Sequence, residues 1–161
     1  MSLQTILEES KQIVFDTGVF IAYFMGESDT LCSLMDQFVF TEHPTVDVIG
    51  HDVLLTEVFY IICRSGGRDR ALENMYKMKA IITIVDTQAL IENAGWIKCK
   101  YSISLPDCFS IATAMLKACP VCFLEESELS TMIVERIKNE TGTSIHILDF
   151  GHEKDVEEAQ G

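Results

Sequence analysis

Short apolar runs recur along the chain, and between them apolar residues return every three to four positions. The short runs predict buried strands, because a strand of a parallel sheet is covered on both faces. They lie at residues 13–15, 46–50, 81–85, 121–124 and 144–148. The third run, Ile81-Ile-Thr-Ile-Val85, consists entirely of β-branched residues, so it is the clearest strand of the set.

The intervening segments have the period of amphipathic helices, with capping residues before them and glycines after several of them. We expect helices over residues 19–24, 30–40, 51–65, 68–79, 87–100, 104–118 and 126–139, with an amphipathic lead-in over 1–12. Because strands and helices alternate, the predicted architecture is an α/β three-layer domain with a mostly parallel central sheet flanked by helices. We expect a single domain over 1–161, with its core at about 12–150 and a polar tail over 151–161.

The composition favours a folded domain without a membrane anchor. The chain has 161 residues, of which 48% are hydrophobic, so there is enough apolar material for a sizeable core. No apolar run reaches the roughly 18 residues of a membrane-spanning helix. The first residues include acids and lack the apolar segment of a secretory signal. We therefore expect a cytoplasmic protein.

Six cysteines are present, and several lie inside apolar runs. A free cysteine in such a context packs as a small hydrophobic residue, so we expect reduced thiols rather than disulfides. Cys119-Pro-Val-Cys122 is a single CxxC pair, and no second pair has the spacing of a zinc ribbon. A structural zinc site at this pair is the alternative interpretation.

The net charge of −13 is unfavourable for a protein that binds nucleic acid, because phosphates repel a negative surface. The charge is unevenly distributed, since residues 64–100 contain seven basic and only four acidic side chains. Arg64, Arg68, Lys98 and Lys100 are therefore candidates for contact with a phosphate backbone. The alternative is a solvated helix surface with ordinary ion pairs.

Asp16 directly follows the first predicted strand. Ligands of open α/β sheets bind at the carboxyl ends of the strands, so this position suits a catalytic or metal-binding carboxylate. Capping of the next helix is the alternative, since aspartate caps helices well. Thr17 supplies a hydroxyl group beside Asp16.

Glu57 is the acid with the most informative context, because residues 54–63 are otherwise uncharged and mostly apolar. An unpaired buried carboxylate is costly, so we expect a cationic or metal partner. The alternative is an exposed or snorkelling side chain.

Asp107 lies near the start of a helix that Ser104 is predicted to cap, where a capping box alone would explain an acid. A catalytic role for Asp107 is therefore inferred only from its occurrence together with Asp16 and Glu57.

Carboxylates that converge on one pocket repel one another, and a hard divalent cation between them relieves the repulsion. Oxygen ligands favour Mg²⁺ or Mn²⁺ over zinc. Such a cation can activate water and stabilise a leaving oxygen, so hydrolysis of a phosphodiester is the predicted reaction class. The four histidines show no metal-ligand spacing and are assigned no role: His43, His51, His146 and His152.

Three segments resemble the motifs of the PIN-domain family in their order and spacing. They are Ile13 to Phe24 with Asp16-Thr17 after an apolar strand, Leu55 to Tyr60 with Glu57 inside a helix, and Ser104 to Ala114 with the pattern L-x-D-x-x-x-x-A-x-A. The resemblance covers about residues 12–150 and implies a Mg²⁺- or Mn²⁺-dependent ribonuclease with Asp16, Glu57 and Asp107 as catalytic acids. It also implies an RNA substrate and, for the VapC-type toxins of the family, a homodimer neutralised by a small antitoxin protein.

The fourth motif departs from the family pattern. After the strand at 121–124 the family usually has Thr-x-Asp, whereas this chain has Leu124-Glu125-Glu126. Glu126 aligns best with the fourth catalytic acid and would be a metal ligand together with Asp16 and Asp107. Glu125 is the neighbouring alternative. The departure and the acidic surface favour a second hypothesis, a PIN-fold protein of weak or absent catalytic activity that acts as a scaffold or regulator.

Proteins that are phosphorylated on an aspartate have a similar sheet, but the residues around Asp16 do not support membership of this class. Phosphatases of the haloacid-dehalogenase type need a second acid two residues after the first, and that position is Gly18. Receiver domains need paired acids ahead of their phosphorylated aspartate, and the sequence has no such pair. The metal-dependent nuclease is therefore the preferred hypothesis.

Overall fold

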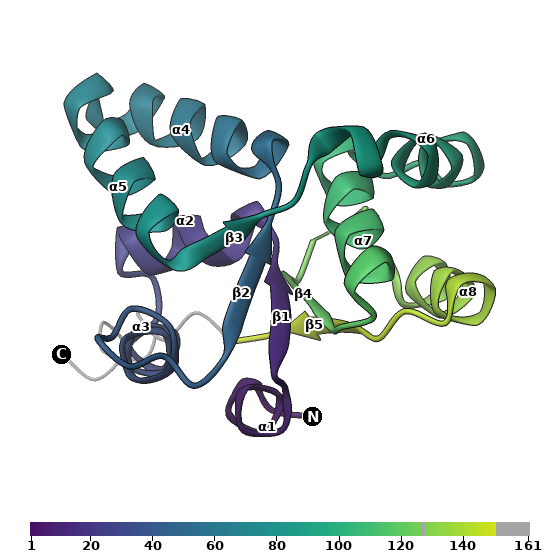
Figure 1. Ribbon diagram of the computed structural model, residues 1–161, viewed down its shortest axis with the longest axis horizontal. Coiled ribbons are helices and arrows are strands. Elements are labelled where there is room, and N and C mark those ends of the chain that lie inside the picture. The colour runs from purple at the N-terminus through teal and green to yellow at the C-terminus, as the bar shows by residue number, and fades with distance from the viewer. Residues whose placement is uncertain (127, 151–161) are drawn as a thin grey trace, which may run out of the picture.

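The computed structural model of the protein describes residues 1–126 and 128–150. Within them five strands form one parallel sheet in the order β3-β2-β1-β4-β5 (Figure 1). The strands are β1 (Gln12–Phe15), β2 (Asp47–Gly50), β3 (Ile82–Ile84), β4 (Val121–Leu124) and β5 (Ile145–Leu148). The strand order reverses between β1 and β4, and such a switch point is where open α/β sheets bind their ligands.

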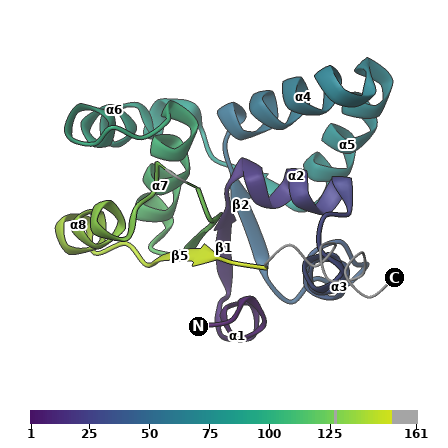
Figure 2. The same ribbon diagram turned by 180° about the vertical axis from the view of Figure 1, so that it is seen from behind.

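Helices cover both faces of the sheet. Figures 1 and 2 show α2, α3, α4 and α5 on one side and α6, α7 and α8 on the other. The helices are α1 (Leu3–Glu9), α2 (Thr17–Met25), α3 (Asp29–Phe38), α4 (Asp52–Gly66), α5 (Arg68–Ile81), α6 (Ile91–Lys100), α7 (Leu105–Lys117) and α8 (Thr131–Thr141), with a 3₁₀ turn η1 (Thr87–Ala89) before α6. None of these helices combines the length and the apolar character that crossing a membrane requires.

Side chains that alternate along the strands divide the core into two clusters. On β1, Ile13 and Phe15 pack with residues of α1 to α5, whereas Val14 packs with residues of α6, α7 and α8. On β4, Cys122 joins the first cluster and Phe123 the second. All five side chains are fully buried. The predicted three-layer α/β architecture is therefore confirmed.

Two helices begin later than the sequence predicts. The helix expected over 126–139 starts at Thr131, because Ser130 caps it by accepting a hydrogen bond from the N–H of Ile133 at 3.4 Å. Glu126 therefore lies in the loop after β4 and not in a helix. The helix expected over 87–100 is divided into η1 and α6, with the buried Leu90 at the junction. The expected polar tail over 151–161 lies outside the described residues.

None of the six cysteines, all of which lie in the described residues, is paired in a disulfide. Cys108, Cys119 and Cys122 are buried, and burial raises the pKa of the Cys108 thiol to about 11. A thiol with such a pKa stays protonated and behaves as a small apolar side chain. Cys99 differs from the others in being exposed on α6.

The close approach of β2 and β3 at Gly50 gives a first prediction. A Cβ at this position would lie 2.7 Å from Cγ2 of Ile82, so Gly50→Ala must displace this side chain of β3. We expect the variant to lose about 1–3 kcal/mol of unfolding free energy in urea denaturation. Gly95→Ala in α6 is the matched control, because nothing lies within 4 Å of its Cβ position, and it is expected to gain about 0.5–1 kcal/mol. Equal effects of the two substitutions would contradict this steric explanation.

Candidate active site

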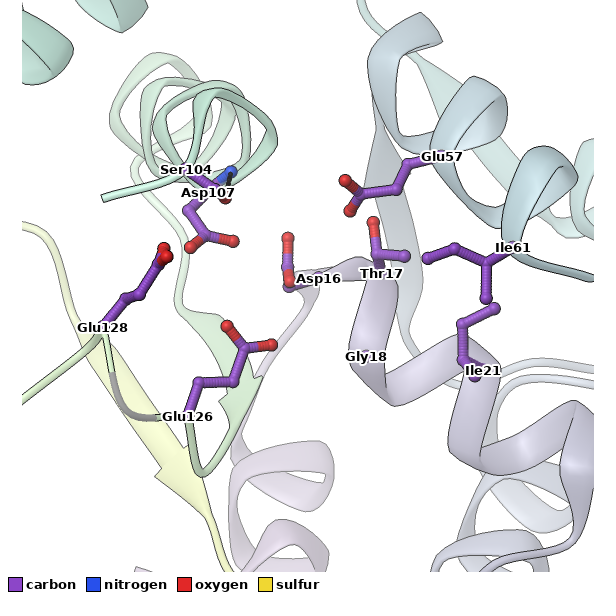
Figure 3. Close-up of a pocket in the computed structure, with 10 residues that line it drawn as sticks. All are labelled: Asp16, Thr17, Gly18, Ile21, Glu57, Ile61, Ser104, Asp107, Glu126 and Glu128. Carbon is purple, nitrogen blue, oxygen red and sulfur yellow. Dashed lines mark hydrogen bonds between the residues drawn. The ribbon is translucent and has the colours of Figure 1, made fainter. Parts of the chain in front are cut away.

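Acidic side chains surround a cleft of about 500 Å³ at the carboxyl ends of β1 and β4 (Figure 3). Its lining consists of five acids, two hydroxyl residues, a glycine and two isoleucines: Asp16, Glu57, Asp107, Glu126, Glu128, Thr17, Ser104, Gly18, Ile21 and Ile61. The cleft thus brings together the four predicted catalytic acids with Thr17 and Ser104. No lysine, arginine or histidine of the described residues lines it.

Asp16 is fixed at the switch point by its backbone and its side chain. Its N–H donates to the carbonyl oxygen of Cys122 on β4 at 3.0 Å. Asp16 is the N-cap residue of α2, yet its carboxylate makes no capping hydrogen bond. Instead, Oδ1 accepts a hydrogen bond from Oγ of Ser110 at 2.8 Å. The carboxylate is therefore directed to the cleft and not to the end of the helix.

Asp107 reaches the cleft from the first turn of α7. Ser104 caps this helix by accepting a hydrogen bond from the N–H of Asp107 at 3.3 Å, and Pro106 lies in the first turn, as the sequence predicts. The Asp107 side chain is 2% exposed, and its Oδ2 is buried without a hydrogen-bond partner among the described residues. Leaving a buried acceptor unsatisfied costs about 1–3 kcal/mol, so a ligand at this atom would be stabilising.

Glu57 enters the cleft from the opposite wall. It lies on α4, is half-buried, and has its carboxylate beside Thr17 and across from Asp107 (Figure 3). Across residues 1–126 and 128–150, no basic side chain forms an ion pair with it. Thr17 is 3% exposed, and its Oγ1 is likewise buried with no hydrogen-bond partner in the part of the chain that the structure describes. This wall therefore presents two oxygen-bearing side chains, Glu57 and Thr17, that are available to a ligand in the cleft.

The loop after β4 contributes two acids. Oε1 of Glu126 lies 3.5 Å from the position that a Cβ would take at Gly18, so Glu126 stands directly over the start of α2. Glu125 is exposed and does not line the cleft, so the geometry favours Glu126 as the fourth acid. Glu128, which the sequence reasoning missed, does line it. The available signal was its place in the acid-rich segment after β4, in which Glu125 and Glu126 also lie.

The two predicted arginines lie on the outer surface of the helical hairpin formed by α4 and α5. Arg64 is exposed near the end of α4, and its guanidinium carbon is 5.0 Å from the centre of the Tyr60 ring. Arg68 is exposed at the first position of α5. Neither lines the cleft, so their contact with a phosphate backbone stays a prediction.

The two predicted lysines are engaged within the protein. Nζ of Lys98 donates to the carbonyl oxygen of Ile103 at 2.6 Å, which ties the end of α6 to the segment before α7. Nζ of Lys100 lies 2.9 Å from a carboxylate oxygen of Glu140. These contacts are the ordinary ion pairs and helix-surface bonds of the alternative interpretation, and RNA contact by either lysine stays a prediction.

The proximity of the acids raises their pKa values. Burial and then the charge of Asp107 raise the pKa of Asp16 well above its usual value. Burial raises the pKa of Asp107 to about 6, and the charge of Glu57 adds to this shift. Burial and neighbouring charges, first that of Asp107, raise the pKa of Glu126 to about 7. The ionisation of three acids of one cleft is therefore shifted to higher pH, and a bound cation would oppose these shifts.

The donor set fits a hard divalent cation. Its charged members are all carboxylates, the ligands that suit Mg²⁺ or Mn²⁺, and two buried oxygens, Asp107 Oδ2 and Thr17 Oγ1, have no protein partner. In the part of the chain that the structure describes, no three side chains of His, Cys, Asp or Glu stand close enough to hold a metal ion. The fit therefore rests on the kind of donors and on their unsatisfied oxygens.

Two residues behind Asp16 were missed by the sequence reasoning. Ser110 and His51 are both fully buried, and His51 had been assigned no role. Ser110 lies one turn after Asp107 on α7, and this i, i+3 spacing was the available signal. His51 directly precedes α4, where only its polar character at a helix start marked it.

The family model for the PIN domain matches residues 13–127. The chain belongs to the PIN domain family. The match confirms the resemblance seen in the three motifs, and it contains the four predicted acids of this PIN domain, Asp16, Glu57, Asp107 and Glu126. No curated protein sequence matches the chain.

This PIN domain is similar in fold to chains of solved toxin–antitoxin structures. A chain of VapBC2 from Rickettsia felis, bound to a promoter DNA fragment, has a TM-score of 0.62 at 10% identity, covering 86% of this chain and 99% of that one. DNA-bound VapBC from Salmonella typhimurium gives 0.58 at 16% identity, over 84% and 97% of the two chains. VapC20 from Mycobacterium tuberculosis, a toxin that cleaves the sarcin–ricin loop, gives 0.52 at 16% identity, over 68% and 86%. At these identities the likeness establishes the fold alone.

Proposed function

We propose that this PIN domain is an endoribonuclease that hydrolyses RNA phosphodiester bonds with Mg²⁺ or Mn²⁺. The observation that carries the proposal is the cleft of five carboxylates, which no basic side chain of residues 1–126 and 128–150 lines. Such a cluster needs protons or a cation to reduce its repulsion. RNA as the substrate is supported by the family and by the fold shared with an RNA-cleaving toxin.

We assign the cation to Asp16, Asp107 and Glu126, whose carboxyl groups point toward one another in Figure 3. A bound Mg²⁺ or Mn²⁺ supplies Lewis-acid chemistry that activates an attacking water and stabilises the leaving oxygen. Asp107 is suited to this role because its Oδ2 is buried without a partner. Glu128 lines the same cleft and adds negative charge that attracts the cation.

The remaining lining residues are assigned to the substrate. Glu57 lies across the cleft from Asp107 and is placed to orient the attacking water and accept its proton. Thr17 and Ser104 carry hydroxyl groups that can donate to a phosphate oxygen. Ile21 and Ile61 form an apolar wall that limits the access of bulk water.

We further propose that the protein is the toxin of a toxin–antitoxin pair, a homodimer in the cytoplasm that a small antitoxin protein neutralises. The support is the fold shared with VapC chains from toxin–antitoxin complexes. Expression of the wild type in a bacterial host is expected to arrest growth, and co-expression of a small protein encoded beside it is expected to restore growth. Growth arrest that Asp16→Asn also produces would contradict the toxin role.

The nuclease proposal is tested with purified protein and end-labelled single-stranded RNA. We expect cleavage with Mg²⁺ or Mn²⁺ that excess EDTA stops, and calorimetric binding of Mn²⁺ to the free protein. Glu126→Gln is expected to weaken both, and Glu125→Gln is expected to have the smaller effect, because only Glu126 lines the cleft. A wild-type protein that binds no Mn²⁺ and cuts no RNA would contradict the proposal.

A catalytically weak or inactive scaffold or regulator is the second candidate function. The absence of basic residues from the cleft lining, within the described chain, favours it, because an RNA backbone needs positive charge beside the cleavage site. The same experiment separates the two candidates. Mn²⁺ binding without cleavage of any RNA, at low salt and high enzyme concentration, would favour the scaffold.

A further inference from the structure

A chain of three buried hydrogen bonds leads from the start of α4 to the cleft. The N–H of Leu54 donates to Nδ1 of His51 at 3.0 Å. Nε2 of His51 lies 3.0 Å from Oγ of Ser110, and this hydroxyl donates to Oδ1 of Asp16 at 2.8 Å. His51 and Ser110 are 0% exposed and Asp16 is 2% exposed, so bulk water does not compete for these bonds.

The direction of each bond in this chain follows from its first donor. A backbone N–H can only donate, so Nδ1 of His51 accepts, and the single ring proton of the neutral imidazole lies on Nε2. Nε2–H therefore donates to Ser110, whose hydroxyl directs its own proton to Asp16. Burial lowers the pKa of His51 to about 4, which keeps the ring neutral at physiological pH.

This arrangement fixes the orientation of the Asp16 carboxylate. A hydroxyl proton aimed at Oδ1 restricts rotation of the carboxylate, and the remaining oxygen is left for a ligand in the cleft.

The competing explanation is a purely structural contact that only holds the fold together, because the three side chains come from segments far apart in the sequence. Asp16 follows β1, His51 follows β2, and Ser110 lies on α7. Packed apolar side chains would hold these elements together without the desolvation of buried polar groups. The series of hydrogen bonds instead ends on a carboxylate of the cleft, which a purely structural contact would not require.

We propose that Ser110 and His51 are positioning residues for Asp16, which fix the orientation of its carboxylate for binding a divalent cation. The inference rests on the proposed metal-dependent function. It adds that this function depends on two side chains that lie behind the cleft and do not line it.

The first test is Ser110→Ala, which removes the hydroxyl and leaves all five cleft acids in place. We expect the affinity for Mn²⁺, measured by calorimetry, to fall about 10- to 100-fold, as is typical when a residue that holds a metal ligand is removed. The kcat for RNA cleavage should fall by a similar factor with little change in KM. An affinity within twofold of wild type would overturn the inference.

Two further variants separate an effect on the orientation of Asp16 from an effect on the stability of the protein. Ser110→Thr keeps the hydroxyl but adds a methyl group at a fully buried site, so it should be less stable than wild type and still bind Mn²⁺ nearly as well. His51→Asn keeps a side chain that can cap α4, but it is too short to reach Ser110, so the affinity for Mn²⁺ should fall while the helix is retained. Affinities that follow the unfolding temperature across these variants would overturn the inference.

Ser130→Ala is the matched control, because it removes the helix cap of α8, a helix that does not line the cleft. It is expected to cost about 1 kcal/mol of unfolding free energy and to leave the affinity for Mn²⁺ unchanged. A loss of Mn²⁺ affinity equal to that of Ser110→Ala would show that general destabilisation explains both results, and it would overturn the inference.

A spectroscopic readout tests the hydrogen-bond chain without metal. Long-range ¹H–¹⁵N spectra of the metal-free wild type at neutral pH should show His51 as the neutral tautomer with its proton on Nε2, and Ser110→Ala should shift the Nε2–H resonance. A proton on Nδ1 would overturn the inference even if Mn²⁺ binds. If the wild type binds no Mn²⁺, the proposed function fails, whereas normal wild-type binding with an unaffected Ser110→Ala overturns only this inference.

Discussion

Asp16→Asn is expected to abolish RNA cleavage and at the same time to stabilise the metal-free protein. The substitution keeps the shape of the side chain and an oxygen that can accept the bond from Ser110, but it removes a buried acid that faces Asp107. Loss of this ligand should lower cleavage by roughly a thousandfold or more. Removal of a charge from a repulsive cluster should raise the unfolding temperature in EDTA by a few degrees.

The measurement combines RNA cleavage with thermal unfolding of the same preparations. Asp47→Asn is the matched control, because it makes the same chemical change at an exposed position at the start of β2, away from the cleft. It should cleave RNA like the wild type and unfold at a similar temperature. An Asp16→Asn protein that cuts RNA at the wild-type rate would mean that the activity belongs to another site or to a contaminant.

The second large effect is a dependence of stability on pH that Mn²⁺ reverses. The pKa of Glu126 is raised to about 7 in the folded protein, so the folded state binds more protons than the unfolded state below that pH. The stability of the metal-free protein should therefore rise as the pH falls from 8 to 6.5. Asp107, with its pKa raised to about 6, acts with the same sign at lower pH.

The titration of His51 sets the lower pH limit of the range in which the stability of the metal-free protein rises as the pH falls. The pKa of His51 is lowered to about 4, so below its ordinary value of 6.5 the unfolded state takes up a proton that the folded state does not, and stability falls with falling pH. Above pH 6.5 the acids dominate. Mn²⁺ binds the ionised carboxylates, so it should stabilise most at pH 8, by about 2.7 kcal/mol at a concentration a hundred times its Kd.

Thermal unfolding at several pH values between 6.5 and 8, with EDTA or with Mn²⁺, measures both effects. Glu126→Gln provides the control, because it removes the group that titrates in this window and should flatten the pH dependence in EDTA. A metal-free protein whose unfolding temperature rises with pH over this range, or that ignores Mn²⁺ at pH 8, would contradict the electrostatic description of the cleft.

The layers of the fold and three of the acids could be predicted because each depends on local sequence. The apolar runs at 13–15 and 121–124 are buried strands in any α/β sheet, and Asp16 is marked by its place at the end of one of them. Glu57 stands out because its helix is otherwise uncharged over ten residues, although the structure shows it half-buried beside the cleft and not deep in the core. Ser104 and Asp107 follow from the chemistry of helix starts.

The remaining parts of the site depend on contacts that local sequence does not encode. The start of α8 was misplaced because the acids after β4 are good helix formers, whereas the cap at Ser130 decides where the helix begins. The bonds of Ser110 join it to residues 59 and 94 positions away, and no periodicity connects such positions. His51 in particular was assigned no role, and only the structure shows that it caps α4 and makes a second bond to Ser110 on α7.

The position of Ser110 on α7 has a mechanical consequence for the two aspartates. Asp107 and Ser110 are three residues apart on one helix, and Ser110 is bonded to Asp16. A helix is stiff over a single turn, so its pitch sets the spacing between Asp107 and the hydroxyl that orients the Asp16 carboxylate. A tilt of α7 would therefore move Asp107 and this hydroxyl together, while the backbone of Asp16 stays with β1 and β4. Glu57 on α4 and Glu126 in the loop after β4 belong to other elements, so they can adjust to a bound substrate independently of α7.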